Sequence, residues 1–212
     1  ENGRRETSAL PRRTPAAAVR FQKGVNFTAE FPDTYVSDGA RETLRLLPEY
    51  GVNAIALVPY GFARLNPLSV RIAGSRSWES DEGVEMMARL AHSLGITVML
   101  KPQLWIPGSW PANLDPPRES RAEFYRQYAA FLEHYAKLAA RVDADFLCIG
   151  VELAKLTPDE TEWRKLIALA RLHYKGRITY GAAQGEDFEN ANFWDALDVI
   201  GISNYYPLPD SL

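Results

Sequence analysis

Cysteine is almost absent from this 212-residue sequence, which has a single one, Cys148. A single cysteine excludes a disulfide within the chain and a cysteine-rich metal site. Because Cys148 lies in the apolar run Phe146-Leu147-Cys148-Ile149, we expect a buried, unreactive thiol. Histidine is also scarce: His92, His134 and His173 fall in separate predicted helices and match no metal-ligand spacing. The sequence therefore predicts no metal centre.

A strong charge of one sign and a long apolar run are missing as well. The net charge is -3, so nothing in the sequence favours nucleic acid or an anionic membrane as a partner. No apolar run approaches the roughly 20 residues of a membrane span. What remains is the composition of a globular protein, with 46% hydrophobic and 24% charged residues. The length is sufficient for one large domain with a sizeable core.

Residues 1–19 differ in composition from the rest of the chain. They carry two arginine pairs, two prolines and an alanine run, without hydrophobic periodicity. We predict a disordered basic tail or linker here, followed by one domain over residues 20–212. The chain begins with Glu1 rather than Met, so we expect that upstream sequence has been removed. A cleaved secretion signal, which would make the protein secreted or periplasmic, fits this start, and so does an engineered expression product.

Short apolar runs rich in β-formers alternate with helical stretches from Val19 onward. The runs are almost continuously apolar, as parallel strands buried on both faces are. Between them, helical stripes recur, for example Phe124, Tyr128, Phe131, Tyr135 and Leu138, or Trp163, Leu166, Ile167 and Ala170. We predict that the second of these helices is capped by Thr157, with Pro158 at its first position and Glu160 completing a capping box. The predicted strands are Arg20–Phe27, Asn53–Val58, Thr97–Lys101, Asp145–Val151, Arg177–Ala182 and Val199–Ser203.

Repeated strand–helix–strand units form a parallel sheet that is either open and doubly wound or closed into a barrel. Two long connections follow predicted strands two and three, from Pro59 to about Ser80 and from Pro102 to about Arg118. Unstructured connections of this length are usually functional, and barrel enzymes build their sites there. The first strand leads into Asn26-Phe27-Thr28-Ala29-Glu30, which is not the Gly-rich phosphate turn of many open sheets.

We therefore predict an α/β fold, a TIM (β/α)8-type barrel. Such a barrel typically needs about 250 residues. Six predicted strands use the chain up to Ser203, and the sequence offers no candidate for strands seven and eight. About six β/α units are therefore expected in this chain.

Glu152 follows the apolar run of the fourth predicted strand. A carboxyl group at a strand end, half-shielded by apolar neighbours, is suited to general acid/base catalysis. A structural ion pair with a nearby lysine or arginine is the alternative. The acidic run 79–82 precedes a helix, where negative charge is favoured at the N-terminus, and we interpret it as structural.

Aromatic side chains gather in the loops after the predicted strands. Flat rings stack on the apolar faces of sugars, and polar neighbours can bind the hydroxyls, so the cluster favours a carbohydrate cleft. The alternative for each tryptophan is that it pins a long loop to the barrel rim. The aromatic residues are Trp78, Trp105, Trp110, Tyr205 and Tyr206, and the polar ones are Lys101, Gln103 and Asn204.

An ordered set of segments resembles the glycoside hydrolase family 113 β-mannanases, a family of the retaining (β/α)8-barrel clan. The set covers nearly the whole chain after the tail, in order and at regular spacing. The segments are Lys23-Gly24-Val25-Asn26-Phe27, Gly51-Val52-Asn53-Ala54-Ile55, Glu79-Ser80-Asp81-Glu82, Val98-Met99-Leu100-Lys101-Pro102, Ile149-Gly150-Val151-Glu152-Leu153, Phe193-Trp194-Asp195 and Ile202-Ser203-Asn204-Tyr205-Tyr206-Pro207.

The resemblance implies an endo-acting hydrolase of β-1,4-mannan that works without metal or cofactor. It implies that Glu152 is the acid/base, that Tyr205 lies close to the nucleophile, and that Lys101 and Trp105 belong to the site. Two positions depart from the clan. Val151 stands where an asparagine commonly contacts the sugar's 2-hydroxyl, and the nucleophile glutamate belongs to a seventh strand that this chain does not reach.

Two other functions stay open on the sequence. One is a non-catalytic carbohydrate-binding or interaction module on a truncated barrel, and the other is a barrel glycosidase of different specificity, such as a cellulase or galactanase. If the barrel is truncated, its first and sixth strands have open apolar edges, and we then expect a homo-oligomer.

Overall fold

The structure is a computed structural model that describes residues 21–72 and 78–207. The predicted tail, residues 1–19, lies outside the described residues, as does Arg20 at the start of the first predicted strand.

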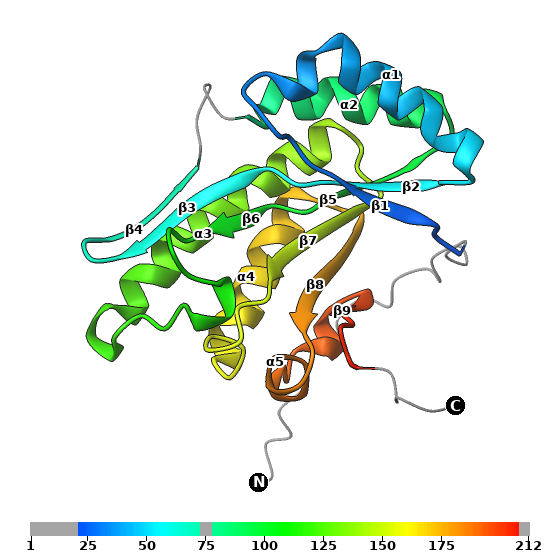
Figure 1. Cartoon of the computed structure of the whole chain (residues 1–212). Helices are drawn as coiled ribbons and strands as arrows, with labels where there is room; N and C mark the ends of the chain where they lie inside the picture. Colours follow the sequence, from blue (N-terminus) through cyan, green and yellow to red (C-terminus); the bar gives the residue numbers. More distant parts are fainter. Residues whose placement is uncertain (1–20, 73–77, 208–212) are drawn as a thin grey trace, which may run out of the picture.

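Six parallel strands form a curved sheet, a half-barrel, in the order β1-β2-β5-β7-β8-β9 (Figure 1). All five neighbouring pairs are parallel, and the order follows the chain, as in a barrel. The predicted barrel units are confirmed, although the first strand is shorter than predicted and begins at Gly24. The strands are β1 (Gly24–Phe27), β2 (Ala54–Leu57), β5 (Thr97–Leu100), β7 (Phe146–Val151), β8 (Arg177–Ala183) and β9 (Val199–Ser203).

Helices connect the strands and cover the sheet (Figure 1), and their apolar stripes are buried. The predicted stripes are confirmed, since the side chains of Phe124, Tyr128, Phe131 and Trp163 are all buried. The rings of Tyr128 and Trp163 meet edge to face 6.1 Å apart between two of the helices. The α-helices are α1 (Asp38–Leu46), α2 (Asp81–Ser93), α3 (Arg118–Arg141), α4 (Glu160–His173) and α5 (Glu186–Asn190); the 3-10 helices are η1 (Thr34–Val36), η2 (Leu47–Tyr50), η3 (Pro111–Asn113) and η4 (Trp194–Ala196).

The starts of α2 and α4 test two predictions, the structural role of the acidic run 79–82 and the capping box at Thr157. Helix α2 is capped by Ser80, whose hydroxyl accepts the Gly83 amide at 3.2 Å, with Asp81 in the first turn, so the structural interpretation holds for this turn. The predicted capping box of α4 is wrong. That helix begins at Glu160 after Asp159, and the Thr157 hydroxyl donates instead to the Ala154 carbonyl at 2.9 Å. Thr157 therefore stabilises the preceding turn rather than the helix.

A second, three-stranded sheet occupies segments that were predicted to be unstructured loops. It has the order β4-β3-β6 and consists of β3 (Tyr60–Leu65), β4 (Leu68–Ile72) and β6 (Gln103–Trp105). Strands β3 and β4 form an antiparallel hairpin, and β6 pairs with β3 in parallel. The hairpin extends from the barrel beside α3 (Figure 1). The prediction of two long unstructured connections was therefore wrong.

Gly61 explains how the hairpin lies so close to α3. A Cβ atom at this position would collide with the ring of Phe131, which is buried in α3. The Val70 amide of β4 donates to the Gln127 side chain of α3 at 2.7 Å and fixes the same contact. The small sheet is thus held as a rigid extension of the barrel.

Candidate active site

Glu152 lies directly after β7, at the carboxyl end of the fourth barrel strand, and is half-buried. The indole N–H of Trp110 donates to its Oε2 at 2.6 Å. Trp110 comes from the segment between β6 and η3, and half of its side chain is exposed. One loop tryptophan of the predicted cluster is therefore brought into direct contact with the predicted acid/base.

The backbone of Glu152 has an unusual conformation that aims its side chain. Its φ is 53°, in the left-handed region, which non-glycine residues enter at a cost that the surroundings must offset. The register between β7 and β8 shifts between Cys148 and Val151, immediately before this residue. The Glu152 amide then donates to the Gly181 carbonyl of β8 at 2.8 Å. Strand β8 therefore fixes the turn from which the carboxylate projects.

A buried chain of hydrogen bonds fixes the next amide. The Leu153 N–H donates to the Tyr180 hydroxyl at 2.8 Å. Because that oxygen accepts the amide, the hydroxyl proton is directed to Asp187 Oδ1, 3.0 Å away. The Ala183 amide donates to Asp187 Oδ2 at 2.6 Å. Asp187 thus secures the Glu152 turn through Tyr180, and both side chains are almost fully buried.

Asp187 is a carboxyl group in an unusually buried position. Burial raises the pKa of Asp187, the hydrogen bonds from Ala183 and Tyr180 lower it, and the nearby Glu152 carboxylate raises it again. Burial also raises the pKa of the Tyr180 hydroxyl well above its usual range. Tyr180 is therefore a neutral hydroxyl near neutral pH and can donate its proton to the hydrogen bond with Asp187.

Glu79 is a second buried carboxylate at the carboxyl ends of the strands, with only 5% of its surface exposed. Burial raises its pKa, while hydrogen bonds from the backbone at Tyr60 and Ala29 lower it. Glu79 therefore links the segments after β1 and β2. Glu79 belongs to the acidic run 79–82, which we interpreted as structural because acidic residues are common before a helix. That interpretation did not predict that the Glu79 side chain is buried.

Lys101 and the other two tryptophans of the predicted cluster, Trp78 and Trp105, lie at the same end of the sheet. Lys101 follows β5, and its Nζ lies 3.5 Å from Asn26 Oδ1 on β1. Trp105 belongs to β6, where its ring meets Tyr60 edge to face at 6.1 Å. Trp78 precedes α2 and is half-exposed. These three side chains are at the predicted end of the barrel, although none of them forms a hydrogen bond or ion pair with Glu152 among the described residues.

The segment after β9 carries the last predicted site residues. Asn204 and Tyr205 are exposed there, and β8 separates β9 from β7 and Glu152. The neighbouring Tyr206 has a different role, because its hydroxyl accepts the Gly185 amide at 2.8 Å. Tyr205 therefore lies at the correct rim, and its catalytic role remains a prediction.

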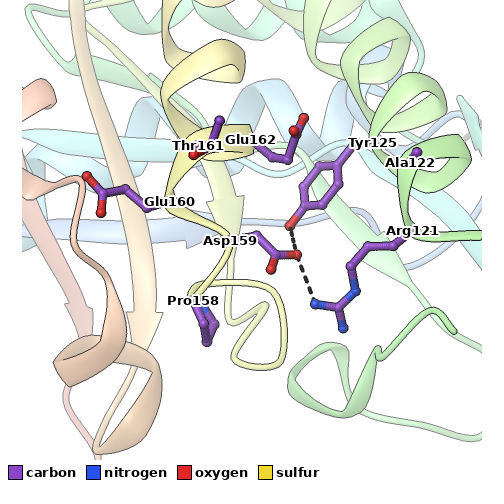
Figure 2. Close-up of a pocket in the computed structure, with 8 residues that line it drawn as sticks. All are labelled: Arg121, Ala122, Tyr125, Pro158, Asp159, Glu160, Thr161 and Glu162. Atoms are coloured by element: carbon purple, nitrogen blue, oxygen red, sulfur yellow. Dashed lines mark hydrogen bonds and ion pairs between the residues drawn. The ribbon is translucent and has the colours of Figure 1, made fainter. Parts of the chain in front are cut away.

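A separate hollow of about 400 Å³ lies between the starts of α3 and α4 (Figure 2). Its central carboxylate, Asp159, accepts hydrogen bonds from Arg121 and Tyr125, both at 2.9 Å (Figure 2). This group joins the two helices through satisfied polar contacts. Within residues 21–72 and 78–207, no cluster of three or more metal-ligating side chains occurs, and no helix is long and apolar enough to cross a membrane.

Comparison with known proteins decides the family. The model of Glycoside Hydrolase Family 113 matches residues 26–211. The chain belongs to this family. A search of curated proteins finds no match.

Solved structures agree with the family assignment. A family 113 β-mannanase from Alicyclobacillus acidocaldarius, in complex with ManMIm, is 30% identical with a TM-score of 0.81, over 89% of this chain and 63% of its own. A second family 113 β-1,4-mannanase complex is 31% identical with a TM-score of 0.81, over 91% and 65%. A fungal β-1,4-galactanase, at 15% identity and a TM-score of 0.52 over 86% and 64%, shows the barrel fold alone. The chain spans less than two thirds of the length of these relatives.

Proposed function

We propose that the protein carrying this chain is a retaining endo-β-1,4-mannanase in which Glu152 is the general acid/base. The observation that supports this most is the position of Glu152, at the end of the fourth barrel strand of a family 113 chain, in contact with Trp110. The mannanases among the similar structures support the choice of substrate.

In this proposal Glu152 works in two steps. It first donates its proton to the oxygen of the leaving sugar while a second carboxylate attacks the anomeric carbon. It then removes a proton from a water molecule, which attacks the anomeric carbon of the glycosyl-enzyme intermediate and releases the sugar from the enzyme. The resemblance to the clan implies a nucleophile on a seventh strand, whereas the structure describes six barrel strands.

Trp110 and the left-handed turn support the acid/base role. A retaining enzyme holds its two carboxyl groups about 5–5.5 Å apart, so the acid must be held in a fixed position. The indole fixes one carboxylate oxygen, and the amides of Glu152 and Leu153 fix the backbone from β8. Lys101, Trp78, Trp105, Asn204 and Tyr205 complete the proposed site around this carboxylate.

The first test replaces Glu152 in the full-length gene product. Glu152→Gln keeps the size and the indole contact but has no proton to donate, so we expect mannan hydrolysis to fall by roughly 10²–10⁴-fold. Glu189→Gln, an exposed glutamate on α5, is the matched control and should remain at the wild-type rate. Unchanged hydrolysis by Glu152→Gln would refute the assignment. Binding of mannan without hydrolysis by the wild type would favour a non-catalytic module, and faster cleavage of cellulose or galactan would favour another specificity.

A further inference from the structure

The solvent face of the β4-β3-β6 sheet carries an aromatic and basic row that leads from Trp105 of the proposed site outward along the hairpin. Side chains alternate along β3, so Gly61 and Ala63 are buried while Phe62 and Arg64 are exposed. Phe62 is directly opposite Trp105 on β6 and opposite Arg71 on β4. Residues paired in this way share one face of the sheet.

The exposure of these side chains is unusual for a rigid sheet. Phe62 is 45% exposed and Trp105 is 55% exposed, although α3 buries the other face of the hairpin. Neither Arg64 nor Arg71 forms an ion pair within the part of the chain that the structure describes. Large exposed apolar groups next to unpaired hydrogen-bond donors are typical of a binding surface.

The sheet is continuous with the active-site end of the barrel. Strand β3 begins three residues after β2 ends, and β6 begins three residues after β5 ends, so both extend barrel strands. Strand β6 also contacts β7, which leads to Glu152. The row from Tyr60 through Phe62 to Arg64 spans about 13 Å, because alternate residues of a strand are about 6.6 Å apart.

We propose that this face binds the glycan chain beyond the sugars next to Glu152, which deepens the proposed function and rests on it. Phe62 and Trp105 offer two flat apolar surfaces on which pyranose rings stack. Arg64 and Arg71 offer donors for the sugar hydroxyls at the edge of the same surface. The occupant is a linear β-linked hexopyranose chain, whose repeated rings match a row of aromatic groups better than a compact ligand does.

Chain length provides the test, with linear β-1,4-mannooligosaccharides as probes of the full-length gene product. Because the active enzyme would cleave these probes, the wild-type reference and every variant in the binding assay carry Glu152→Gln. We expect Phe62→Ala to weaken binding of the hexasaccharide by roughly five- to tenfold, the loss of one stacked ring, in calorimetry. The disaccharide, which fills only the sites next to Glu152, should bind as it does to the wild type. Phe62→Trp should restore the affinity for the hexasaccharide. Tyr50→Ala is the control, because Tyr50 is an equally large ring, 82% exposed, on η2 before β2 begins.

The outcomes separate this inference from the proposed function. Equal binding of the hexasaccharide by wild type and Phe62→Ala would overturn the inference, as would an equal loss for both probes. An unchanged thermal midpoint of Phe62→Ala is expected, since the side chain is exposed, and it shows that the loss is not one of folding. A length-dependent loss of binding for Phe62→Ala, together with no mannan hydrolysis by the protein that retains Glu152, would uphold the glycan surface and refute the catalytic proposal.

Discussion

At the residue scale, Glu79 both joins two segments through hydrogen bonds and destabilises the fold when it is ionised, because its carboxylate is buried. It accepts hydrogen bonds from the backbone of two segments, yet burial raises its pKa from the usual 4.5. Between that value and the raised pKa, the folded state holds a proton that the unfolded state has released. The free energy of unfolding therefore contains a component that falls as pH rises through this window.

A glutamine at this position tests the sign of that component. Glu79→Gln cannot titrate, so the difference in unfolding free energy, wild type minus variant, should decrease as pH rises from about 4.5. Urea denaturation of both proteins at several pH values measures it. Glu49→Gln, an exposed glutamate on η2, is the control for the substitution itself. A wild-type advantage that grows with pH would contradict the burial cost at Glu79.

At the scale of elements, β8 holds the end of β7 through Tyr180. Tyr180→Phe leaves the buried Leu153 N–H without its partner, so we expect a loss of about 1–3 kcal/mol of unfolding free energy. Because the Glu152 turn loosens, kcat on mannan should also fall, by roughly 10²-fold if the carboxylate moves about 1 Å. Denaturation and steady-state kinetics measure the two effects.

Tyr128 provides the matched control for this prediction. Its buried hydroxyl donates to the Ile149 carbonyl of β7 at 2.8 Å, within the strand rather than at the Glu152 turn. Tyr128→Phe should lose similar stability but keep kcat near the wild-type value. An equal fall in kcat for both variants would mean that Tyr180 acts only through stability.

The central barrel strands β2, β5, β7 and β8 could be predicted from sequence because their burial on both faces makes them almost continuously apolar. The edge strands β1 and β9 carry the same apolar pattern, although they are largely exposed. The small sheet was missed because its strands alternate instead. Leu68, Val70 and Ile72 alternate with Ser69 and Arg71 after an Asn-Pro turn, and that period of two would have revealed β4. The position of Glu152 followed from its strand, whereas the role of Asp187 depends on contacts with Tyr180 that no local pattern encodes.

At the scale of the whole molecule, the sheet ends in two strands with one neighbour each, β1 and β9. Ile200 and Ile202 of β9 are 58% and 38% exposed. We therefore expect the 212-residue chain, produced by itself, to self-associate through these edges. Light scattering should show a species larger than a monomer, and Ile200→Lys should shift it toward monomer. Leu172→Lys on α4, at a site 71% exposed, is the control and should not. A monodisperse wild-type monomer would contradict this expectation.

The acid/base role of Glu152 is tested most directly by the dependence on the leaving group. In the full-length gene product, Glu152→Ala should slow the hydrolysis of mannan by roughly 10²–10⁴-fold. Formation of the glycosyl-enzyme from an activated aryl β-mannoside, whose leaving group needs no proton, should remain near the wild-type rate in pre-steady-state measurements. Equal losses on both substrates, or no loss on mannan, would contradict the account.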